Sequence, residues 1–409
     1  MLKKTIAALS LLSILAACQS DGDSQKPKPR KDIILTRTEQ QITNSGTDFA
    51  FRFFTQVCAS ETKKPNLFVS PLSASFCLSM IANGASGNTL AEMKSTLGFT
   101  DYSLEDMNNY NQKLATALLD LDNTTRIGIA NSIWLKQGFS VYDDFLNVNK
   151  RMYDARVQEL DFASPKAIDI INQWCIEKTN NCIKEVIQEI PEEVRMYLLN
   201  ALYFKGIWKN QFKKSDTKQE VFNNADGSKS EVPMMNLSMK SFNYIQNDFF
   251  SIAELPYGNE AFSMVVFLPA ENKTLDESLP KLTYENWNEW NGKLFSNVLN
   301  VKLPRFELKY DKDLITDMIE LGMKDAFTDA ADFSKMSAFD LSIGILSQFT
   351  FVNVNEEGTE AAAVTVGGMV ETSAGPSSSY NFYVDRPFVF MIKEKSTGAI
   401  LFMGKVTKL

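Results

Sequence analysis

Hydrophobic side chains recur at helical spacing through most of the first half of the chain. Phe49, Phe53 and Val57 lie four residues apart, so the stretch from Ser45 to Cys58 is predicted to be a helix with one apolar face. Ser70-Pro71 is a typical helix start. The same reasoning predicts helices over 72–82, over a stretch that ends at Gly98, over 102–122 and over 168–188, with short strands at 67–69 and 126–135.

From Tyr197 onward the pattern changes to apolar runs bounded by turn residues, which is typical of strands. The runs are MYLLNALYFKGIW, SFNYI, SIAELPYG, FSMVVFLP, VLNVKLPRFELKY and FVFMIKEKSTGAILFMGKV, of which the last is a hairpin. One helix is predicted among them, from Asp311 to Leu321. Helices in the first half and strands in the second, without an internal linker, predict an α+β fold in a single domain over residues 39–409.

The composition narrows the possible chemistry. The chain has 409 residues, of which 44% are hydrophobic, and this is enough for a large core. A net charge of −8 without a basic run disfavours a nucleic-acid partner. Histidine is absent, which excludes Ser-His-Asp and Cys-His hydrolases and HExxH zinc sites. Triads of Ser and Lys remain possible, so an enzyme is disfavoured, and neither a cofactor nor a metal is expected.

The first 17 residues have the pattern of an export signal, with two lysines, an apolar run too short to span a membrane, and small residues at its end. Leu15-Ala16-Ala17-Cys18 resembles the bacterial lipobox, in which the cysteine becomes the lipidated N-terminus. The alternative is a plain signal peptide with an incidental cysteine. Residues 18–38 are rich in Pro and Lys and are predicted to be a flexible tether. The sequence therefore predicts an exported, membrane-anchored lipoprotein of a bacterial envelope.

The remaining cysteines are Cys58, Cys77, Cys175 and Cys182, and each lies in an apolar, helix-like stretch. They form no CxxC pair and no dense framework. We therefore predict buried thiols rather than disulfides or a metal site.

Several motifs, in the same order along the chain, resemble those of the serpin family of serine protease inhibitors. Residues 66–73 (NLFVSPLS) resemble the family's first strand and the helix that follows it, and residues 199–208 (LNALYFKGIW) resemble the strand motif NAxYFKGxW. ELPY at 254–257, LPRF at 303–306, RPF at 386–388 and FMGKV at 402–406 fit as well. The resemblance covers essentially the whole chain after residue 45. It implies the serpin fold, with helices clustered toward the N-terminal half around three β-sheets and an exposed reactive-centre loop.

The resemblance identifies residues 356–385 as this loop. In the family a protease cleaves the loop and becomes acylated, and the loop then inserts as a strand into the central sheet and traps the enzyme. The hinge from which insertion starts is assigned to Glu356, Gly358, Thr359, Glu360, Ala361, Ala362 and Ala363.

The hinge residues themselves suit insertion. In a strand, alternate side chains face the core. The set that begins with Thr359, Ala361 and Ala363 is small and uncharged, whereas Glu360 falls on the opposite set. A charged side chain on the buried set would make insertion of the strand less favourable by several kcal/mol. Ten to fifteen residues that gain ladder hydrogen bonds, at about 0.5–1.5 kcal/mol each, would release on the order of 10–20 kcal/mol.

The scissile bond follows from a count along the loop. In the family it lies about sixteen residues after the hinge's first glutamate, which gives Thr372-Ser373; a count back from RPF ends near Pro376, so the bond is placed between residues 369 and 374. No Lys or Arg lies between Gly358 and Asp385, which disfavours trypsin-like enzymes. We expect elastase-like or subtilisin-like serine proteases, and papain-like cysteine proteases second.

A polar cluster beneath the opening sheet, the shutter, is assigned by the resemblance to Ser70, Ser73, Asn200 and Gln348. Gln348 stands where many serpins carry a histidine, so any pH dependence through histidine is lost; the alternative is a surface glutamine in a loop. The acidic face at 102–122 disfavours a heparin-type polyanion site.

The function predicted is that of a monomeric, single-use inhibitor whose partners are a target protease, bound covalently, and the membrane, reached through the lipid. The alternative is a non-inhibitory serpin that acts as a surface binding module.

Overall fold

The computed structural model describes residues 27–359 and 379–409. Helices gather in the first half of the chain, as the hydrophobic spacing predicts: α1 (Arg37–Ser60), α2 (Pro71–Ala82), α3 (Gly87–Thr96), α4 (Leu104–Leu118), α5 (Asp143–Tyr153) and α6 (Pro165–Lys178). The second half adds α7 (Leu275–Ser278), α8 (Tyr284–Lys293), α9 (Ile315–Glu320) and the single turns η1 (Lys214–Asp216), η2 (Leu279–Lys281) and η3 (Asp325–Phe327).

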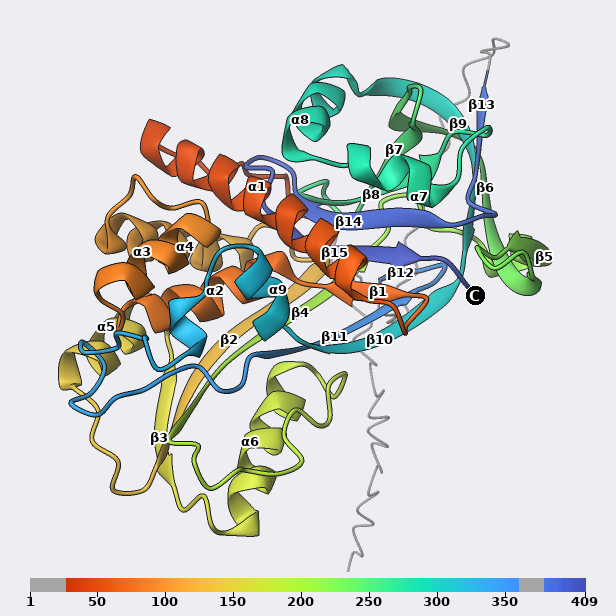
Figure 1. The fold of residues 1–409 in the computed structure, drawn as a ribbon. Coiled ribbons are helices and arrows are strands. Elements are labelled where there is room, and N and C mark those ends of the chain that lie inside the picture. Colours follow the sequence, from red (N-terminus) through yellow and green to blue (C-terminus); the bar gives the residue numbers. More distant parts are fainter. Residues whose placement is uncertain (1–26, 360–378) are drawn as a thin grey trace, which may run out of the picture.

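A six-stranded sheet crosses the lower part of the molecule in Figure 1, in the order β10-β11-β12-β4-β2-β3. Its strands are β2 (Thr125–Lys136), β3 (Arg156–Leu160), β4 (Met196–Ile207), β10 (Phe306–Asp313), β11 (Ser347–Val354) and β12 (Gly358–Thr359). β2 pairs antiparallel with β4 and parallel with β3, and β10 pairs antiparallel with β11. Helix α2 packs against one face of β4, and α6 covers the other face of β2 and β4.

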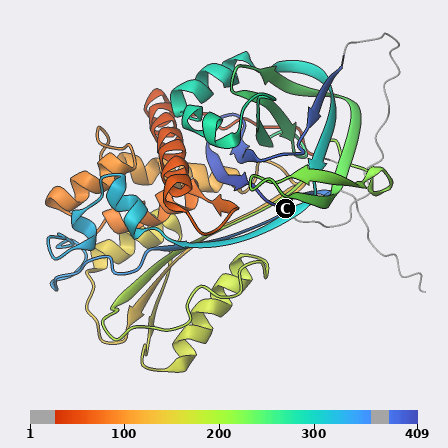
Figure 2. The same ribbon diagram turned by 45° about the vertical axis from the view of Figure 1, so that its right-hand side comes forward.

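A nine-stranded sheet forms the other part, in the order β1-β15-β14-β8-β7-β6-β9-β13, with β5 attached to β6. The strands are β1 (Leu67–Val69), β5 (Lys218–Asn223), β6 (Lys229–Gln246), β7 (Phe250–Pro256), β8 (Phe262–Pro269), β9 (Phe295–Pro304), β13 (Tyr380–Tyr383), β14 (Phe388–Glu394) and β15 (Ile400–Val406). β8 and β14 are buried at every residue, because helices cover them and the opposite face packs on the core. Helix α1 crosses in front of β14 and β15 in Figure 1, and Figure 2 shows it beside this sheet.

The resemblance implies three sheets, whereas the described strands form two continuous ones. The reason is β6, whose 18 residues pair with β5 at one end and with β7 at the other. β6 also pairs with β9 along its length, with a register shift between Leu237 and Lys240. This bulge bends β6 instead of ending it. The strands that pair with the first part of β6 and those that pair with its second part therefore belong to one continuous sheet.

Several predicted boundaries differ from the structure. The helix predicted over 168–188 ends at Lys178, because Asn180 and Asn181 adopt left-handed backbone angles (φ 51° and 65°) that stop a helix. Cys182 therefore lies in a loop. The prediction of a buried thiol is confirmed for Cys58 and Cys175, whereas Cys77 and Cys182 are half-buried, and none of these four described cysteines forms a disulfide. Asp311 and Asp313 belong to strand β10 rather than to a helix.

The N-terminal boundary also shifts. Helix α1 begins at Arg37, and Thr36 caps it: its hydroxyl accepts a hydrogen bond from Glu39 N, and the Glu39 carboxylate accepts one from Thr36 N at 2.6 Å. Residues 27–36, which the sequence assigns to the flexible tether, lie against the body of the molecule. Lys28 N donates to Asn123 Oδ1 (2.8 Å), and Ile33 N donates to Ser396 Oγ (2.9 Å). Cys18 lies outside the described residues. No helix in the described ranges has the length and the apolar character needed to cross a bilayer.

Candidate functional site

The short strand β12 links the two central strands of the six-stranded sheet. Thr359 pairs with Val354 of β11 on one side and with Gly206 of β4 on the other, and Gly358 pairs with Ile207 of β4. Among the described residues, β11 and β4 have no direct pairing with each other. The sheet is thus joined at this end by two residues of β12.

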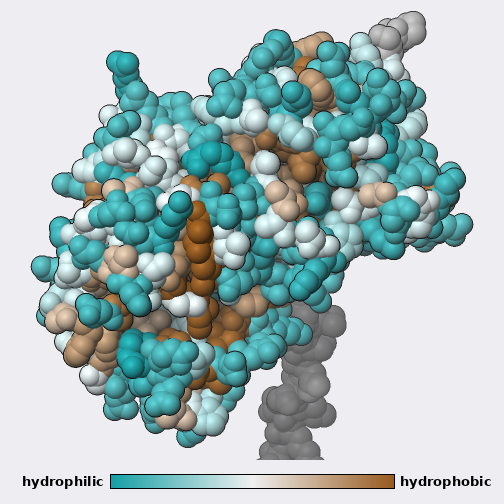
Figure 3. Space-filling model, in the orientation of Figure 1, coloured by the Kyte–Doolittle hydropathy of each residue, from teal (hydrophilic) through white to brown (hydrophobic). Residues whose placement is uncertain are grey.

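Farther along the same strands, a cavity of about 530 Å³ lies between β4 and β11. Its walls are residues 198–201 of β4, residues 343–349 in and before β11, Ser73 and Cys77 of α2, and Trp174 and Cys175 of α6. Figure 3 shows hydrophobic surface between the lobe that carries α6 and the part of the molecule above it. Burial raises the pKa of the Cys77 and Cys175 thiols to about 12, so neither supplies a thiolate at neutral pH. The cavity has the position and the apolar character of a slot for one more strand.

Gly358 is the residue that lets β12 approach β4. A Cβ at this position would lie 1.9 Å from the carbonyl oxygen of Gly206 and 2.8 Å from the Cα of Ile207. Its φ of +157° is also a conformation that glycine adopts readily. Asn355 and Gly358 close a tight turn, in which Asn355 N donates to Gly358 O (2.9 Å). A residue with a side chain therefore cannot occupy this position without moving the strand.

An aromatic cluster holds the start of β12. The Tyr257 hydroxyl and the Thr359 hydroxyl are hydrogen-bonded at 2.6 Å, and both side chains are buried. Trp208 stacks on Tyr257, with ring centroids 4.4 Å apart, and its indole Nε1 donates to Asn355 O (2.9 Å). The same tryptophan's backbone N donates to Glu357 O (2.9 Å). These contacts fix the backbone of residues 355–359 between the two sheets.

Glu356 carries a buried carboxylate, 2% exposed, at the base of the hinge. It accepts hydrogen bonds from the Arg305 guanidinium and from Thr217 Oγ1. Burial acts to raise the pKa of Glu356, but the hydrogen bonds and charge of Arg305 together with the Thr217 hydroxyl outweigh it and lower the pKa below its usual value. The neighbouring Glu357 pairs instead with the exposed Lys214, at 2.9 Å. Glu356 therefore anchors the hinge as a paired anion.

The shutter residues lie at the rim of the cavity. Gln348 is 8% exposed in β11, so it is not a surface glutamine in a loop. Its amide bonds the backbone of Ser70 twice: Nε2 donates to Ser70 O and Oε1 accepts from Ser70 N, both at 2.8 Å. The Ser70 hydroxyl donates to Leu401 O and accepts from Ser73 N. Gln348, Ser70 and Ser73 are thus directly connected.

Asn200 is the shutter residue that stands apart. Its Nδ2 donates to Asn131 Oδ1 (2.7 Å), and it has no contact of this kind with Gln348. Its buried Oδ1 accepts no hydrogen bond from any described residue. Asn200, Ser73 and Gln348 all line the cavity, on opposite sides of the slot. An amide oxygen is therefore available to a donor that enters between β4 and β11.

Comparison with known proteins identifies the family of the chain. The family model described as serpin (serine protease inhibitor) matches residues 44–409. The chain belongs to the serpin family. It is 33% identical over 379 residues to the leukocyte elastase inhibitor of Homo sapiens, with 90% of this chain and 99% of the relative covered. The native structure of the thermophilic serpin tengpin matches with a TM-score of 0.81 at 32% identity, covering 95% of this chain and 98% of that one.

Another solved serpin, human thyroxine-binding globulin in complex with thyroxine, matches with a TM-score of 0.81 at 26% identity, covering 91% of this chain and 99% of that one. The α+β serpin fold expected from the motifs is therefore confirmed. Of the assigned loop, Glu356, Gly358 and Thr359 are described. Glu360, Ala361, Ala362, Ala363 and the predicted bond Thr372-Ser373 lie outside the described residues.

Sequence reasoning missed the partners of the hinge. Arg305, Thr217 and Tyr257 are 51, 139 and 102 residues away from the hinge residues that they bond. The motifs LPRF and ELPY contain two of them, but the sequence alone assigned these motifs no function. Their role follows from the way β7 and β9 end beside β12.

Proposed function

We propose that this serpin is an irreversible suicide-substrate inhibitor of serine proteases. A protease cleaves the loop between residues 369 and 374, at Thr372-Ser373, and forms an acyl-enzyme. The hinge then enters the slot between β4 and β11. The nucleophile belongs to the protease, and the inhibitor itself does not turn over as an enzyme. Elastase-like and subtilisin-like enzymes are the preferred targets, with papain-like cysteine proteases second, because the loop offers small and apolar residues and no cation.

The position of β12 above the cavity carries the proposal. Thr359 is paired with both neighbours, so strand addition needs only to continue in the same register. Continuation would bring residue 361 between Val352 and Phe204, and residue 365 between Gln348 and Asn200, by extension of the observed pairs. The side chain of Thr359 points into the core, where it meets Tyr257.

The same register fits the alternation of the loop sequence. Residues 361, 363 and 365 share the inward face of Thr359, and they are Ala, Ala and Thr. The Thr365 hydroxyl would arrive beside the Asn200 Oδ1 that lacks a donor. Glu360 would face away from the core. Over residues 359–369 the inserted strand therefore buries no charge, and it supplies one missing hydrogen bond.

Incubation with elastase, subtilisin, papain and trypsin tests the proposal. We expect an SDS-resistant adduct with elastase or subtilisin, and mass spectrometry of the released C-terminal peptide should locate the cut between residues 369 and 374, at Thr372-Ser373. An adduct with trypsin alone would overturn the specificity. Cleavage by every enzyme without an adduct would overturn the inhibitory mechanism.

The proposed setting is the bacterial envelope. The signal at 1–17 would export the chain, and a lipid on Cys18 would hold a monomeric inhibitor at a membrane. No nucleic acid and no heparin-type activator takes part in this proposal. Labelling with a radioactive fatty acid, compared between the native chain and Cys18→Ala, tests the anchor; equal labelling of both would refute it.

A second candidate is a non-inhibitory serpin that binds a ligand at its surface. The structural relative, thyroxine-binding globulin in complex with thyroxine, illustrates that this fold can bind a small ligand. The small, uncharged side chains on the inner face of the hinge disfavour this second candidate, because a loop that never inserts does not require small, uncharged side chains there. The adduct experiment distinguishes the two.

A further inference from the structure

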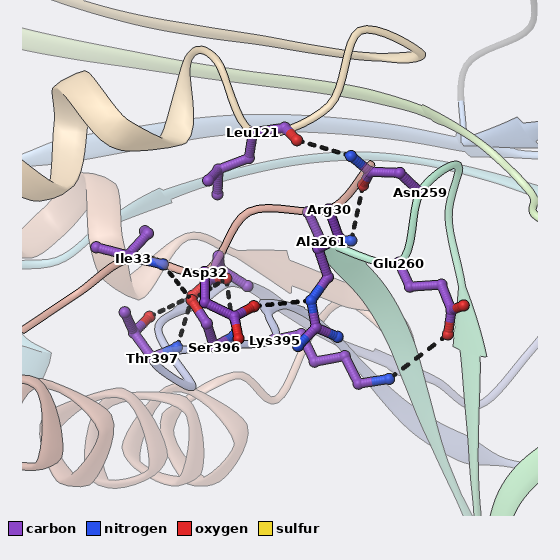
Figure 4. Close-up of polar contacts among 11 residues, drawn as sticks. Arg30, Asp32, Ile33, Leu121, Asn259, Glu260, Ala261, Lys395, Ser396 and Thr397 are labelled. Atoms are coloured by element: carbon purple, nitrogen blue, oxygen red, sulfur yellow. Dashed lines mark hydrogen bonds and ion pairs between the residues drawn. The ribbon is translucent and has the colours of Figure 1, made fainter. Parts of the chain in front are cut away.

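The N-terminal segment 27–36 is fixed to the body of the molecule by its backbone. Lys28 N bonds Asn123 Oδ1, and Ile33 N bonds Ser396 Oγ, so the two anchors lie on different loops. Figure 4 shows Ile33 beside Ser396 in the β14–β15 turn, and Arg30 beside Asp32. The side chains of this segment therefore have a defined direction relative to the surface.

The hydrophobic residues of the segment alternate. Ile33 and Leu35 are half-buried and Ile33 packs against the main core, as expected for an extended stretch with one face on the protein. Ile34 points the other way and is 79% exposed, the largest exposed fraction of any large hydrophobic side chain in the described ranges. Nothing in residues 27–359 or 379–409 covers it, and an isoleucine in water is unfavourable.

The segment that carries Ile34 is mainly positive in sequence. Residues 27–37 carry Lys28, Arg30, Lys31 and Arg37 against one carboxylate, Asp32, in a chain whose net charge is −8. Arg30 is matched by Asp32, with Nε and Oδ1 2.8 Å apart. Within the described structure, the other three cations form no ion pair. An exposed isoleucine thus belongs to a segment that carries three cations without an ion pair in the described structure, on an acidic protein.

We propose that segment 27–37 is a membrane-contact surface for a bilayer that contains anionic phospholipid. Lys28, Lys31 and Arg37 would meet the headgroup phosphates, and Ile34 would enter the interfacial layer. The exposed apolar side chain favours a bilayer over a soluble polyanion, which would use the charges but offer Ile34 no apolar environment. This surface requires neither the lipid on Cys18 nor protease inhibition, so it can be tested apart from both.

Vesicle sedimentation tests the surface with the chain that begins at residue 18 and carries Cys18→Ser, so that no lipid is attached. The probes are vesicles of phosphatidylglycerol with phosphatidylcholine, and of phosphatidylcholine alone, at low and high salt. The test variant is Lys28→Gln, Lys31→Gln and Arg37→Gln, which keeps the Arg30–Asp32 pair and both backbone anchors. The matched control removes the same charge elsewhere, from the exposed Lys166, Lys184 and Lys213.

We expect binding to the anionic vesicles that salt weakens. The partition coefficient should fall about fivefold for each cation removed from the segment, or about a hundredfold for the three. Ile34→Ser should lower it about tenfold at either salt concentration. Equal loss in the test and control variants, at matched melting temperatures, would overturn the proposal. Heparin binding that survives Ile34→Ser, without vesicle binding, would reassign the segment to a soluble polyanion.

Discussion

Replacement of Glu356 by Gln should destabilise the intact molecule more than the same change at the adjacent Glu357. The Glu356 side chain is 2% exposed and accepts hydrogen bonds from Arg305 and Thr217, whereas the Glu357 side chain is 18% exposed and pairs with Lys214, which is 70% exposed. Hydrogen bonds to a buried charge contribute about 1.5–3 kcal/mol. Arg305 is 44% exposed and can be solvated after the change, so the full penalty for an unpaired buried ion does not apply.

The expected decrease in the free energy of unfolding is about 2–3 kcal/mol for Glu356→Gln. For the control Glu357→Gln it is below about 1 kcal/mol, because pairs at the surface contribute little. Urea unfolding followed by tryptophan fluorescence measures both, since Trp208 lies beside the hinge. Equal losses in the two variants would refute the reasoning that burial makes Glu356 the anchor.

The Glu356 carboxylate makes the stability of the folded chain depend on pH, and the sign of this dependence follows from its pKa. The pKa of Glu356 is lower in the folded than in the unfolded chain, so its contribution to stability is complete above the unfolded pKa and is lost as the pH falls through the folded pKa. The difference in stability between the native chain and Glu356→Gln should therefore shrink with acidification. A difference that grows toward low pH would contradict this sign.

Three further substitutions test the site. Gly358→Ala places a Cβ against the backbone of β4, so hinge insertion should slow and the ratio of cleaved free chain to covalent adduct should rise on denaturing gels; an unchanged ratio would contradict the close approach. Gln348→Leu leaves the buried N–H of Ser70 without a partner, while the Ser70 C=O keeps its hydrogen bond from Ala74 N, so the change should cost about 1–3 kcal/mol of intact-state stability or promote spontaneous insertion; unchanged urea unfolding and native-gel mobility would remove Gln348 from this role. Tyr257→Phe removes the hydrogen bond to Thr359 and should cost about 1 kcal/mol in the same unfolding assay.

Local signals predicted the parts of the fold that depend on neighbouring residues. Ser70 and Pro71 start α2, as expected from capping and from the fixed φ of proline. Apolar runs predicted β8 and β14, because strands buried on both faces lose the polar alternation. Helix α8 was missed, because its sequence YENWNEWNGK has two buried tryptophans but low overall hydrophobicity.

Contacts between segments that are distant in the sequence could not be predicted from local patterns. The composition of the hinge predicted a small, neutral inner face, but not that Arg305 and Tyr257 hold its base. The segment 27–36 has the composition of a tether, and its docking depends on two acceptors, Asn123 and Ser396, that no local pattern marks. Fixed backbone and side-chain contacts of this kind are decided by how the sheets pack together.

The melting temperature of the molecule before and after a single cut in the loop tests the central claim most directly. If the freed strand fills the slot between β4 and β11, the gain of about 10–20 kcal/mol should raise the melting temperature by more than about 10 °C. Mass spectrometry should first show that the cut lies between residues 369 and 374 and that both fragments remain associated. A nicked molecule that melts no higher than the intact one would contradict strand insertion, and with it the inhibitory mechanism.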